Sequence, residues 1–163
     1  MLTSRLEVRP PTEDDRERMV QLWCDESFMV FSNGVTDIPE ANRRFDEMLV
    51  RAEELPFAKQ PVMELATGMI IGYSGANRCE FEGRNRLEFG YRLIPEARGR
   101  GYATEASQAV LTKSAETFSG EMLAFIDPRN NASQNVARKL GFEFWKLDTV
   151  MGYLDNIYRL QIG

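Results

Sequence analysis

The sequence contains no histidine among its 163 residues. Ser-His-Asp and Cys-His catalytic groups are therefore excluded, as is every zinc site with a histidine ligand. The only two cysteines, Cys24 and Cys79, do not form a CxxC pair, so we expect neither a redox dithiol nor a metal site. An enzyme built from this chain has to move protons with carboxylates, tyrosine, lysine, cysteine or water.

Long apolar runs and an excess of positive charge are also lacking. No run approaches the roughly 18 residues of a membrane span, and the first residues lack the pattern of a signal peptide, so we expect a cytoplasmic protein with no membrane partner. The net charge is −5 without a Lys/Arg run, which argues against a nucleic-acid partner. A hydrophobic content of 43% suffices for a core, and we expect residues 1–163 to form one domain.

Helical and alternating patterns follow one another along the chain. They predict helices over residues 12–24, 39–55, 101–118 and 132–140, and strands over residues 5–9, 62–66, 69–76, 86–94, 121–126, 142–147 and 150–160. Ser32-Asn33-Gly34 is predicted as a turn, and residues 77–85 as a polar loop or a bent extension. This order predicts an α+β fold of three layers, with helices on both sides of a sheet.

A glycine-rich loop, residues 95–104, follows a predicted strand and opens a predicted helix. Its glycines allow backbone N–H groups to point inward, and a helix N-terminus adds partial positive charge. Arg98 and Arg100 supply formal charge, so the loop suits a phosphate or pyrophosphate. It is neither a P-loop nor a dinucleotide fingerprint, because GK[ST] and GxGxxG are both absent. An ordinary turn with solvated arginines is the alternative reading of these residues alone.

The loop sequence RGRGYA at residues 98–103 matches the R/Q-x-x-G-x-G/A pyrophosphate loop of the GNAT acyl-CoA N-acyltransferases. Residues 88–106 resemble the RimJ/RimL-type branch of that family, as does the opening segment of residues 5–10. A second block resembles the N-x-x-S-x-x-v-x-x-K-l-G-F segment of the branch and consists of Asn130, Ser133, Val136, Lys139, Leu140, Gly141 and Phe142. The resemblance implies a mixed, mostly antiparallel sheet of about seven strands with four helices, splayed between strands 4 and 5.

The resemblance also implies roles for individual residues. Backbone groups of Leu93 and Ile94 would pair with the pantetheine arm of coenzyme A. Asn130 and Ser133 would border that arm near the thioester, although both also suit helix capping. The backbone N–H groups that would hold the pyrophosphate belong to Arg98, Gly99, Arg100, Gly101, Tyr102, Ala103 and Thr104.

One position departs from the family pattern. Many GNAT enzymes carry a tyrosine four residues after the position of Ser133, as general acid for the leaving thiolate, and this chain has Ala137 there. Ser133 is the local substitute, a swap that the RimJ/RimL-type branch shares. Alternatively no acid is needed, since a thiolate of pKa ~8.5 is a tolerable leaving group. Tyr153 and Tyr158 on the last predicted strand are further candidates, although packing explains both.

These features together predict an acetyl-CoA-dependent N-acetyltransferase in which a primary amine, from a protein N-terminus or a small molecule, attacks directly in a ternary complex. Glu88 is the candidate general base, and a salt bridge with Arg86 or Arg92 is its structural alternative. The competing function is a non-catalytic, CoA-binding regulatory module. The sequence leaves open the acceptor, the acyl group, the general acid and the oligomeric state, with a homodimer among the alternatives.

Overall fold

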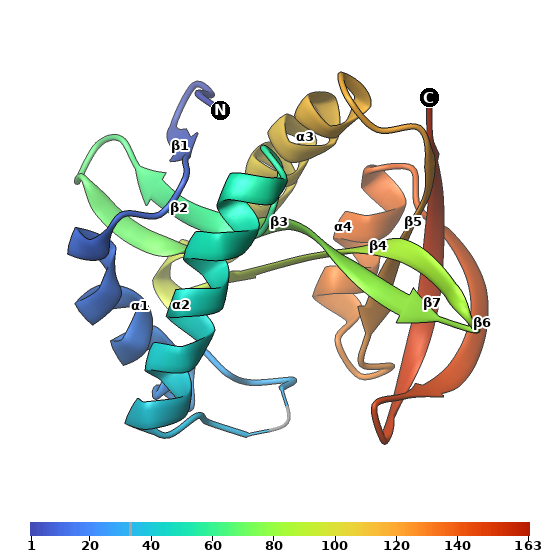
Figure 1. The fold of residues 1–163 in the computed structure, drawn as a ribbon, viewed down its shortest axis with the longest axis horizontal. Coiled ribbons are helices and arrows are strands. Elements are labelled where there is room, and N and C mark those ends of the chain that lie inside the picture. The colour runs from blue at the N-terminus through green and yellow to red at the C-terminus, as the bar shows by residue number, and fades with distance from the viewer. Residues whose placement is uncertain (33) are drawn as a thin grey trace.

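The computed structural model describes residues 1–32 and 34–163 (Figure 1). The turn predicted around Asn33 therefore lies partly outside the described residues. The strands are β1 (Leu6–Val8), β2 (Gln60–Glu64), β3 (Met69–Phe81), β4 (Arg84–Leu93), β5 (Gly120–Ile126), β6 (Glu143–Val150) and β7 (Tyr153–Ile162). The α-helices are α1 (Arg16–Trp23), α2 (Ile38–Glu54), α3 (Tyr102–Ala115) and α4 (Asn131–Lys139), and short 3-10 turns cover Glu13–Asp15 and Pro95–Ala97.

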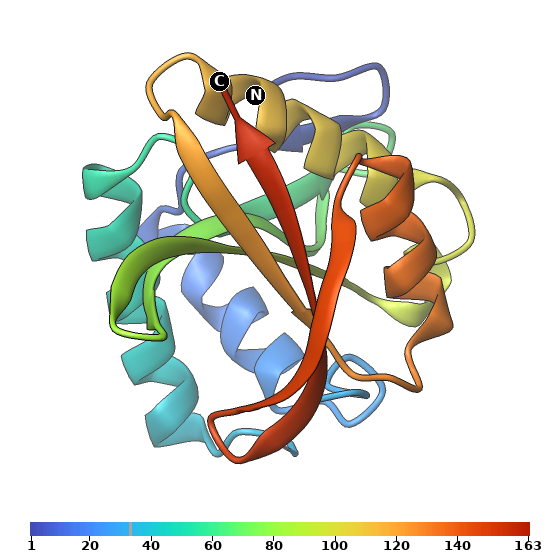
Figure 2. The same ribbon diagram turned by 90° about the vertical axis from the view of Figure 1, so that its right-hand side faces the viewer.

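The described strands form one sheet in the order β1-β2-β3-β4-β5-β7-β6. Every neighbouring pair is antiparallel except β4 and β5, which are parallel. These two strands pair only at Leu87 with Met122 and Glu88 with Leu123. Beyond Glu88 they diverge, and Figure 2 shows β5, β7 and β6 side by side in front of β4. The expected mixed sheet that splays between its fourth and fifth strands is confirmed.

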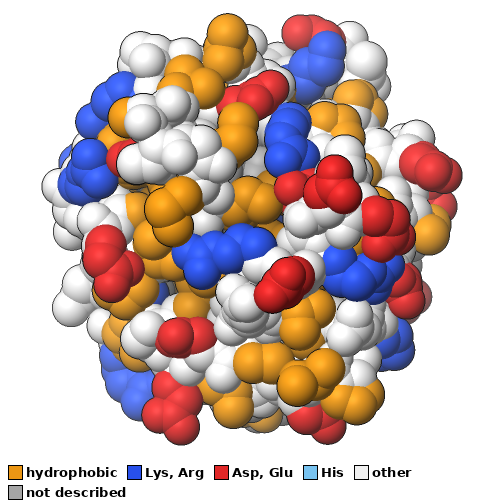
Figure 3. All heavy atoms as spheres, turned by 90° about the vertical axis from the view of Figure 1, so that its left-hand side faces the viewer, with side chains coloured by type: hydrophobic (Ala, Val, Ile, Leu, Met, Phe, Trp, Pro, Cys, Tyr) orange, Lys and Arg blue, Asp and Glu red, His pale blue; other side chains and the backbone are white. Residues whose placement is uncertain are grey.

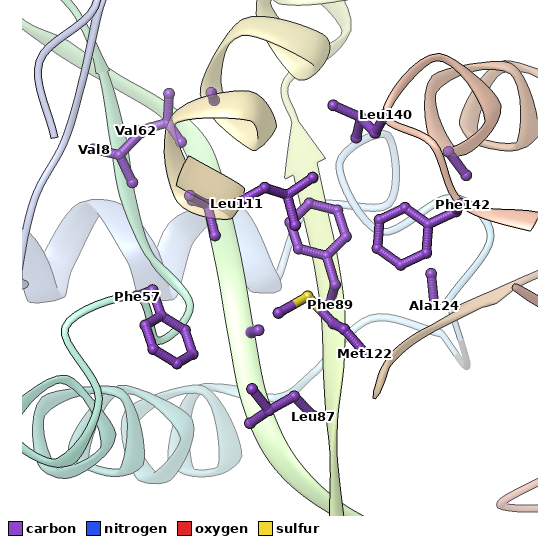
Figure 4. Close-up of a cluster of buried hydrophobic side chains, with 14 of the residues drawn as sticks. Val8, Phe57, Val62, Leu87, Phe89, Leu111, Met122, Ala124, Leu140 and Phe142 are labelled. Carbon is purple, nitrogen blue, oxygen red and sulfur yellow. The ribbon is translucent and has the colours of Figure 1, made fainter. Parts of the chain in front are cut away.

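Helices cover both faces of the sheet, as the element order predicts. One core cluster lies under α3 and α4 and includes Phe89 and Phe142, whose ring centroids are 5.6 Å apart. Figure 4 shows this cluster. A second cluster joins α1 and α2 to the opposite face, around Trp23 and Phe45. Because side chains alternate along β4, Leu87, Phe89 and Leu93 enter the first cluster. Glu88, Gly90 and Arg92 consequently face the side of α1 and α2.

The segment 77–85 differs most from the expectation. It is mainly strand: β3 continues to Phe81, the chain turns at Glu82 and Gly83, and β4 begins at Arg84. Aromatic packing explains the extension, because the Phe81 ring contacts those of Phe125 and Trp145 on neighbouring strands. Similarly, the β6–β7 hairpin turns at Met151-Gly152, where no turn is predicted. Among the described residues, no helix is both long and apolar enough to cross a bilayer.

Candidate active site

The glycine-rich loop has the conformation expected of an anion-binding loop. Gly99 and Gly101 adopt left-handed φ angles of 72° and 80°, which side chains disfavour. Gly101 precedes the first residue of α3 without a side-chain cap. The backbone N–H groups from Gly99 to Thr104 donate no hydrogen bond to any of the described residues. A row of free N–H groups at a helix start therefore fits a pyrophosphate group.

The two arginines of this loop are engaged with the protein itself. The Arg98 side chain donates from Nε to the Leu93 carbonyl at 3.0 Å and from Nη2 to the Ser27 carbonyl at 2.8 Å. Arg100 pairs with Glu64 at 3.1 Å and stacks on the Tyr102 ring. In this conformation the backbone N–H groups of the loop are available to an anion, whereas the guanidinium groups of Arg98 and Arg100 are already bound to groups of the protein.

The edge of β4 that faces β5 is open after Glu88, because no described strand pairs with it there. Such an edge can accept an amide chain as an additional strand. The two residues expected to do this are already partly engaged. The Leu93 carbonyl accepts from Arg98, and the Ile94 N–H donates to Ile71 at 2.9 Å. The open edge therefore suits an amide arm, although its pairing with Leu93 requires the carbonyl to accept a second bond or Arg98 to move.

The beginning of α4 lies beside this open edge. The Asn130 side chain caps the helix by accepting from the Ser133 N–H at 3.1 Å, so the capping role weighed for Asn130 is confirmed. The Ser133 hydroxyl lies 3.1 Å from the phenol oxygen of Tyr91 on β4. No sequence motif marks Tyr91, whose side chain packs against the same core cluster as Leu87 and Phe89. Among the later tyrosines, Tyr158 is buried and Tyr153 is 48% exposed.

Glu88 is held by Lys59, a residue that no sequence motif marks. The Glu88 Oε2 atom lies 2.5 Å from Lys59 Nζ. The expected partners bind elsewhere: Arg86 pairs with Glu121, and Arg92 donates to the carbonyls of Phe28 and Val30. A salt bridge is thus present, but with a residue from the loop before β2. The missing side chain of Gly90 leaves room for this approach, since a Cβ there would lie only 3.2 Å from Lys59 Nζ.

A second carboxylate group, that of Asp155 on β7, is close enough to Glu88 for the two charges to influence each other. Asp155 is half-buried, and burial together with the nearby Asp127 and Glu88 raises its pKa. Asp127 differs, because its hydrogen bonds with Arg129 lower its pKa. Asp155 is therefore a second candidate proton acceptor.

Within residues 1–32 and 34–163, no group of three or more Cys, Asp or Glu side chains is arranged to hold a metal ion.

A hollow of about 440 Å³ adjoins the loop on the side of α1. Its lining includes residues 94–97 and Arg100 but also Asp25 and Glu64. Figure 3 shows that acidic and basic side chains are interspersed over this face. A lining of mixed charge does not favour a polyanion, so we do not assign the cofactor to this hollow.

The loop, the open strand edge and the order of elements agree with the family that the sequence resembles. The family model described as an acetyltransferase (GNAT) domain matches residues 5–143. The chain belongs to the GNAT acetyltransferase family. The GNAT chain is 27% identical over 148 residues to YkkB, an uncharacterized protein of Bacillus subtilis (strain 168), with 90% of this chain and 86% of YkkB covered.

Solved GNAT structures share the whole fold. An acetyltransferase from Agrobacterium tumefaciens str. C58 has a TM-score of 0.82 and 26% identity, covering 98% of this chain and 92% of that one. RimL, a ribosomal L7/L12 alpha-N-protein acetyltransferase in complex with coenzyme A, has a TM-score of 0.77 and 20% identity, covering 99% and 97%. At that identity the likeness to RimL concerns the fold.

Proposed function

We propose that this GNAT chain is an acetyl-CoA-dependent N-acetyltransferase that acts on a primary amine by direct attack in a ternary complex. The observation that carries the proposal is the row of backbone N–H groups from Gly99 to Thr104, which have no acceptor within residues 1–32 and 34–163, next to the open edge of β4. We further propose that residues 1–163 act as one domain and that the chain is of the RimJ/RimL type. The free thiols of Cys24 and Cys79 suit the reducing cytoplasm.

The residues present fit acetyl-CoA in two places. The N–H groups of the loop would hold the pyrophosphate, and the open edge of β4 would pair with the pantetheine amides. Asn130 and Ser133, at the start of α4, would border the arm near the thioester. When bound, the cofactor supplies an activated acetyl group. RimL, which has the same fold, is described with coenzyme A bound, and this supports the choice of ligand.

The acceptor would approach from the side of Glu88. An alkyl amine of pKa ~10 is almost wholly protonated at neutral pH and cannot attack until it loses a proton. Glu88 Oε2 accepts a hydrogen bond from Lys59 Nζ, but the second carboxylate oxygen, Oε1, accepts none from any described residue. We therefore propose that Glu88 accepts the proton of the amine at Oε1, directly or through water, and that Lys59 positions the carboxylate.

Ligand binding and thiol release test this function. Acetyl-CoA should raise the melting temperature, because a ligand of the native state stabilises it. Gly101→Val should abolish this shift, since a branched side chain would block the approach of the pyrophosphate to the backbone. Gly83→Val is the matched control: Gly83 also has a left-handed φ in open space, but it lies in the β3–β4 turn. An acetyl-CoA shift that persists in Gly101→Val would contradict the assigned site.

Release of free CoA thiol across a panel of amines then separates the two functions. The panel should contain peptide N-termini, amino sugars, polyamines and amino acids, with blanks that lack acetyl-CoA to account for the two protein thiols. Amine-dependent release supports the enzyme. Binding without release for every amine would favour the non-catalytic CoA-binding module.

A further inference from the structure

A pair of hydroxyl groups bridges the two sides of the splay. Tyr91 lies on β4, three residues beyond the last pair that β4 forms with β5. Ser133 lies on α4, which follows β5 in the chain. The phenol oxygen of Tyr91 and the Ser133 Oγ are 3.1 Å apart, so one donates a hydrogen bond to the other. The contact thus links β4 to α4 at the point where β4 and β5 have separated.

Both members of the pair are held in place by their surroundings. The Ser133 N–H is bound by Asn130, whose own N–H donates to the Asp127 carbonyl at 2.9 Å. Tyr91 packs against the core cluster under α3 and α4. Packed neighbours reduce the number of rotamers that each hydroxyl group can occupy. The two oxygens therefore face a fixed position between β4 and α4.

The next turn of α4 offers no alternative hydroxyl group. Ala137 is buried there, and Tyr158 is turned toward Gln134, whose side-chain oxygen it contacts at 3.0 Å. A hydroxyl group beside the open edge of β4 therefore comes from Ser133 or from a residue that contacts it. Tyr91 is such a residue, from a different element.

We propose that Tyr91 is a further residue of the reaction, and that its phenol and the Ser133 hydroxyl form a hydrogen-bond-donating pair for the sulfur that leaves during acetyl transfer. This inference rests on the proposed function. As the carbon–sulfur bond breaks, the sulfur keeps the bonding electrons and leaves as a thiolate that accepts hydrogen bonds from the two hydroxyl groups. The amine proton accepted by Glu88 passes to solvent, and solvent protonates the thiolate when coenzyme A is released.

The protonation state of Tyr91 agrees with a donor. Burial raises the pKa of its phenol, so the group keeps its proton at neutral pH. The hydrogen bond with Ser133 and the charge of Arg98 act in the opposite direction and lower the pKa of Tyr91, but burial outweighs them. Glu88 projects from the opposite face of β4, where it is bound by Lys59.

Coenzyme A itself, the thiol product, is a probe that does not depend on turnover. Hydroxyl donors beside the sulfur would favour its thiolate form and lower the thiol pKa in the complex. The affinity for CoA should therefore rise about sixfold between pH 7 and pH 9, which corresponds to a lowering of the thiol pKa by about one unit from ~8.5. Desulfo-CoA, which lacks the sulfur, should show no such rise and corrects for every other titrating group.

Three variants, measured by calorimetry with both ligands, assign the effect. Tyr91→Phe and Ser133→Ala should each reduce the sixfold rise to less than about threefold, where the rise is taken for each variant from the ratio of its CoA affinity to its own desulfo-CoA affinity at the two pH values. Tyr91→Phe should also lower kcat about tenfold at pH 7. Tyr158→Phe is the matched control, because it removes a hydroxyl group that contacts α4 away from Ser133, and it should keep the rise.

The outcomes distinguish this inference from the proposed function. Failure of the unaltered protein to bind CoA would overturn both. Binding of CoA with the same pH dependence as desulfo-CoA, or an undiminished rise in Tyr91→Phe, would overturn the hydrogen-bond-donating pair alone. An equal loss in Tyr158→Phe would also overturn it, because the effect would then come from the placement of α4.

Discussion

Glu88 illustrates how one side chain in the site depends on a distant contact. Its partner Lys59 comes from the loop before β2 and crosses Gly90 to reach the carboxylate. The ion pair is partly shielded, with side-chain exposures of 21% for Lys59 and 22% for Glu88. Burial opposes the charge of Lys59, but the nearby Glu88 outweighs it and raises the lysine pKa, so the ammonium stays charged. Lys59 therefore fixes one carboxylate oxygen and leaves the other available.

The role of Glu88 is tested by Glu88→Gln, which keeps the shape and removes the basicity. We expect kcat at pH 7 to fall about 100-fold with nearly unchanged acetyl-CoA affinity, because only proton transfer is lost. The loss should shrink at high pH, where the amine arrives neutral. Steady-state kinetics from pH 6.5 to 10 measure both effects.

The control for Glu88→Gln is Glu121→Gln, which removes the carboxylate of another ion pair in the same sheet and should leave kcat largely unchanged. Normal turnover of Glu88→Gln at pH 7, together with a loss in Asp155→Asn, would transfer the role of proton acceptor to Asp155.

At the scale of the elements, the sequence predicts what local pattern controls. The helix periodicity, the prolines and the glycine loop place α2, α3, α4 and β4 within a few residues. The extent of β3 beyond Ala76 escapes prediction, because the contacts of Phe81 with Phe125 and Trp145 come from strands distant in sequence. The same limit applies to the site. The loop and Ser133 are visible as motifs, whereas Lys59 and Tyr91 acquire meaning only through tertiary contacts.

Close contact between β3 and β4 depends on glycine at position 72. Gly72 pairs with Leu93, and a Cβ atom there would overlap the carbonyl group of Arg92. Backbone atoms cannot move aside as a flexible side chain could, so we expect Gly72→Ala to lower the free energy of unfolding by about 3 kcal/mol. Urea denaturation measures the change.

The comparison for Gly72 is Gly152→Ala in the β6–β7 turn. Gly152 has a φ of 87° but open space around it, so only backbone strain should be added, at about 1 kcal/mol. Equal losses in the two variants would show that close contact between the strands is not the cause.

Over the whole molecule, charges of opposite sign lie close together and neutralise one another locally. On α2, Arg43 binds both Glu40 and Glu47, and the surface in Figure 3 mixes both signs. Glu105 has a wider reach. Its carboxylate accepts hydrogen bonds from Thr3, Ser4 and Arg5, and Arg5 in turn donates to the Arg100 carbonyl at 3.0 Å. One side chain at the start of α3 therefore connects the beginning of the chain with the proposed pyrophosphate loop.

This connection predicts a specific dependence of stability on pH. Burial raises the pKa of Glu105, but the hydrogen bonds from Thr3, Arg5 and Ser4 outweigh it and hold the pKa at about 2. Since the folded pKa lies below the usual value of 4.5, the stabilisation is complete above pH 4.5 and is lost as the pH falls toward 2. Glu105→Gln should lower the free energy of unfolding at pH 7 by about 1–2 kcal/mol, a value reduced because Arg5 is 46% exposed to solvent. The difference from the unaltered protein should shrink between pH 4.5 and 2, as measured by urea denaturation at each pH.

The control is Glu116→Gln, which removes an exposed partner of Lys113 near the end of the same helix. It should change the free energy of unfolding by less than about 0.5 kcal/mol. A difference for Glu105→Gln that stays constant down to pH 2 would mean that packing, rather than the charge of the carboxylate, joins the start of the chain to α3.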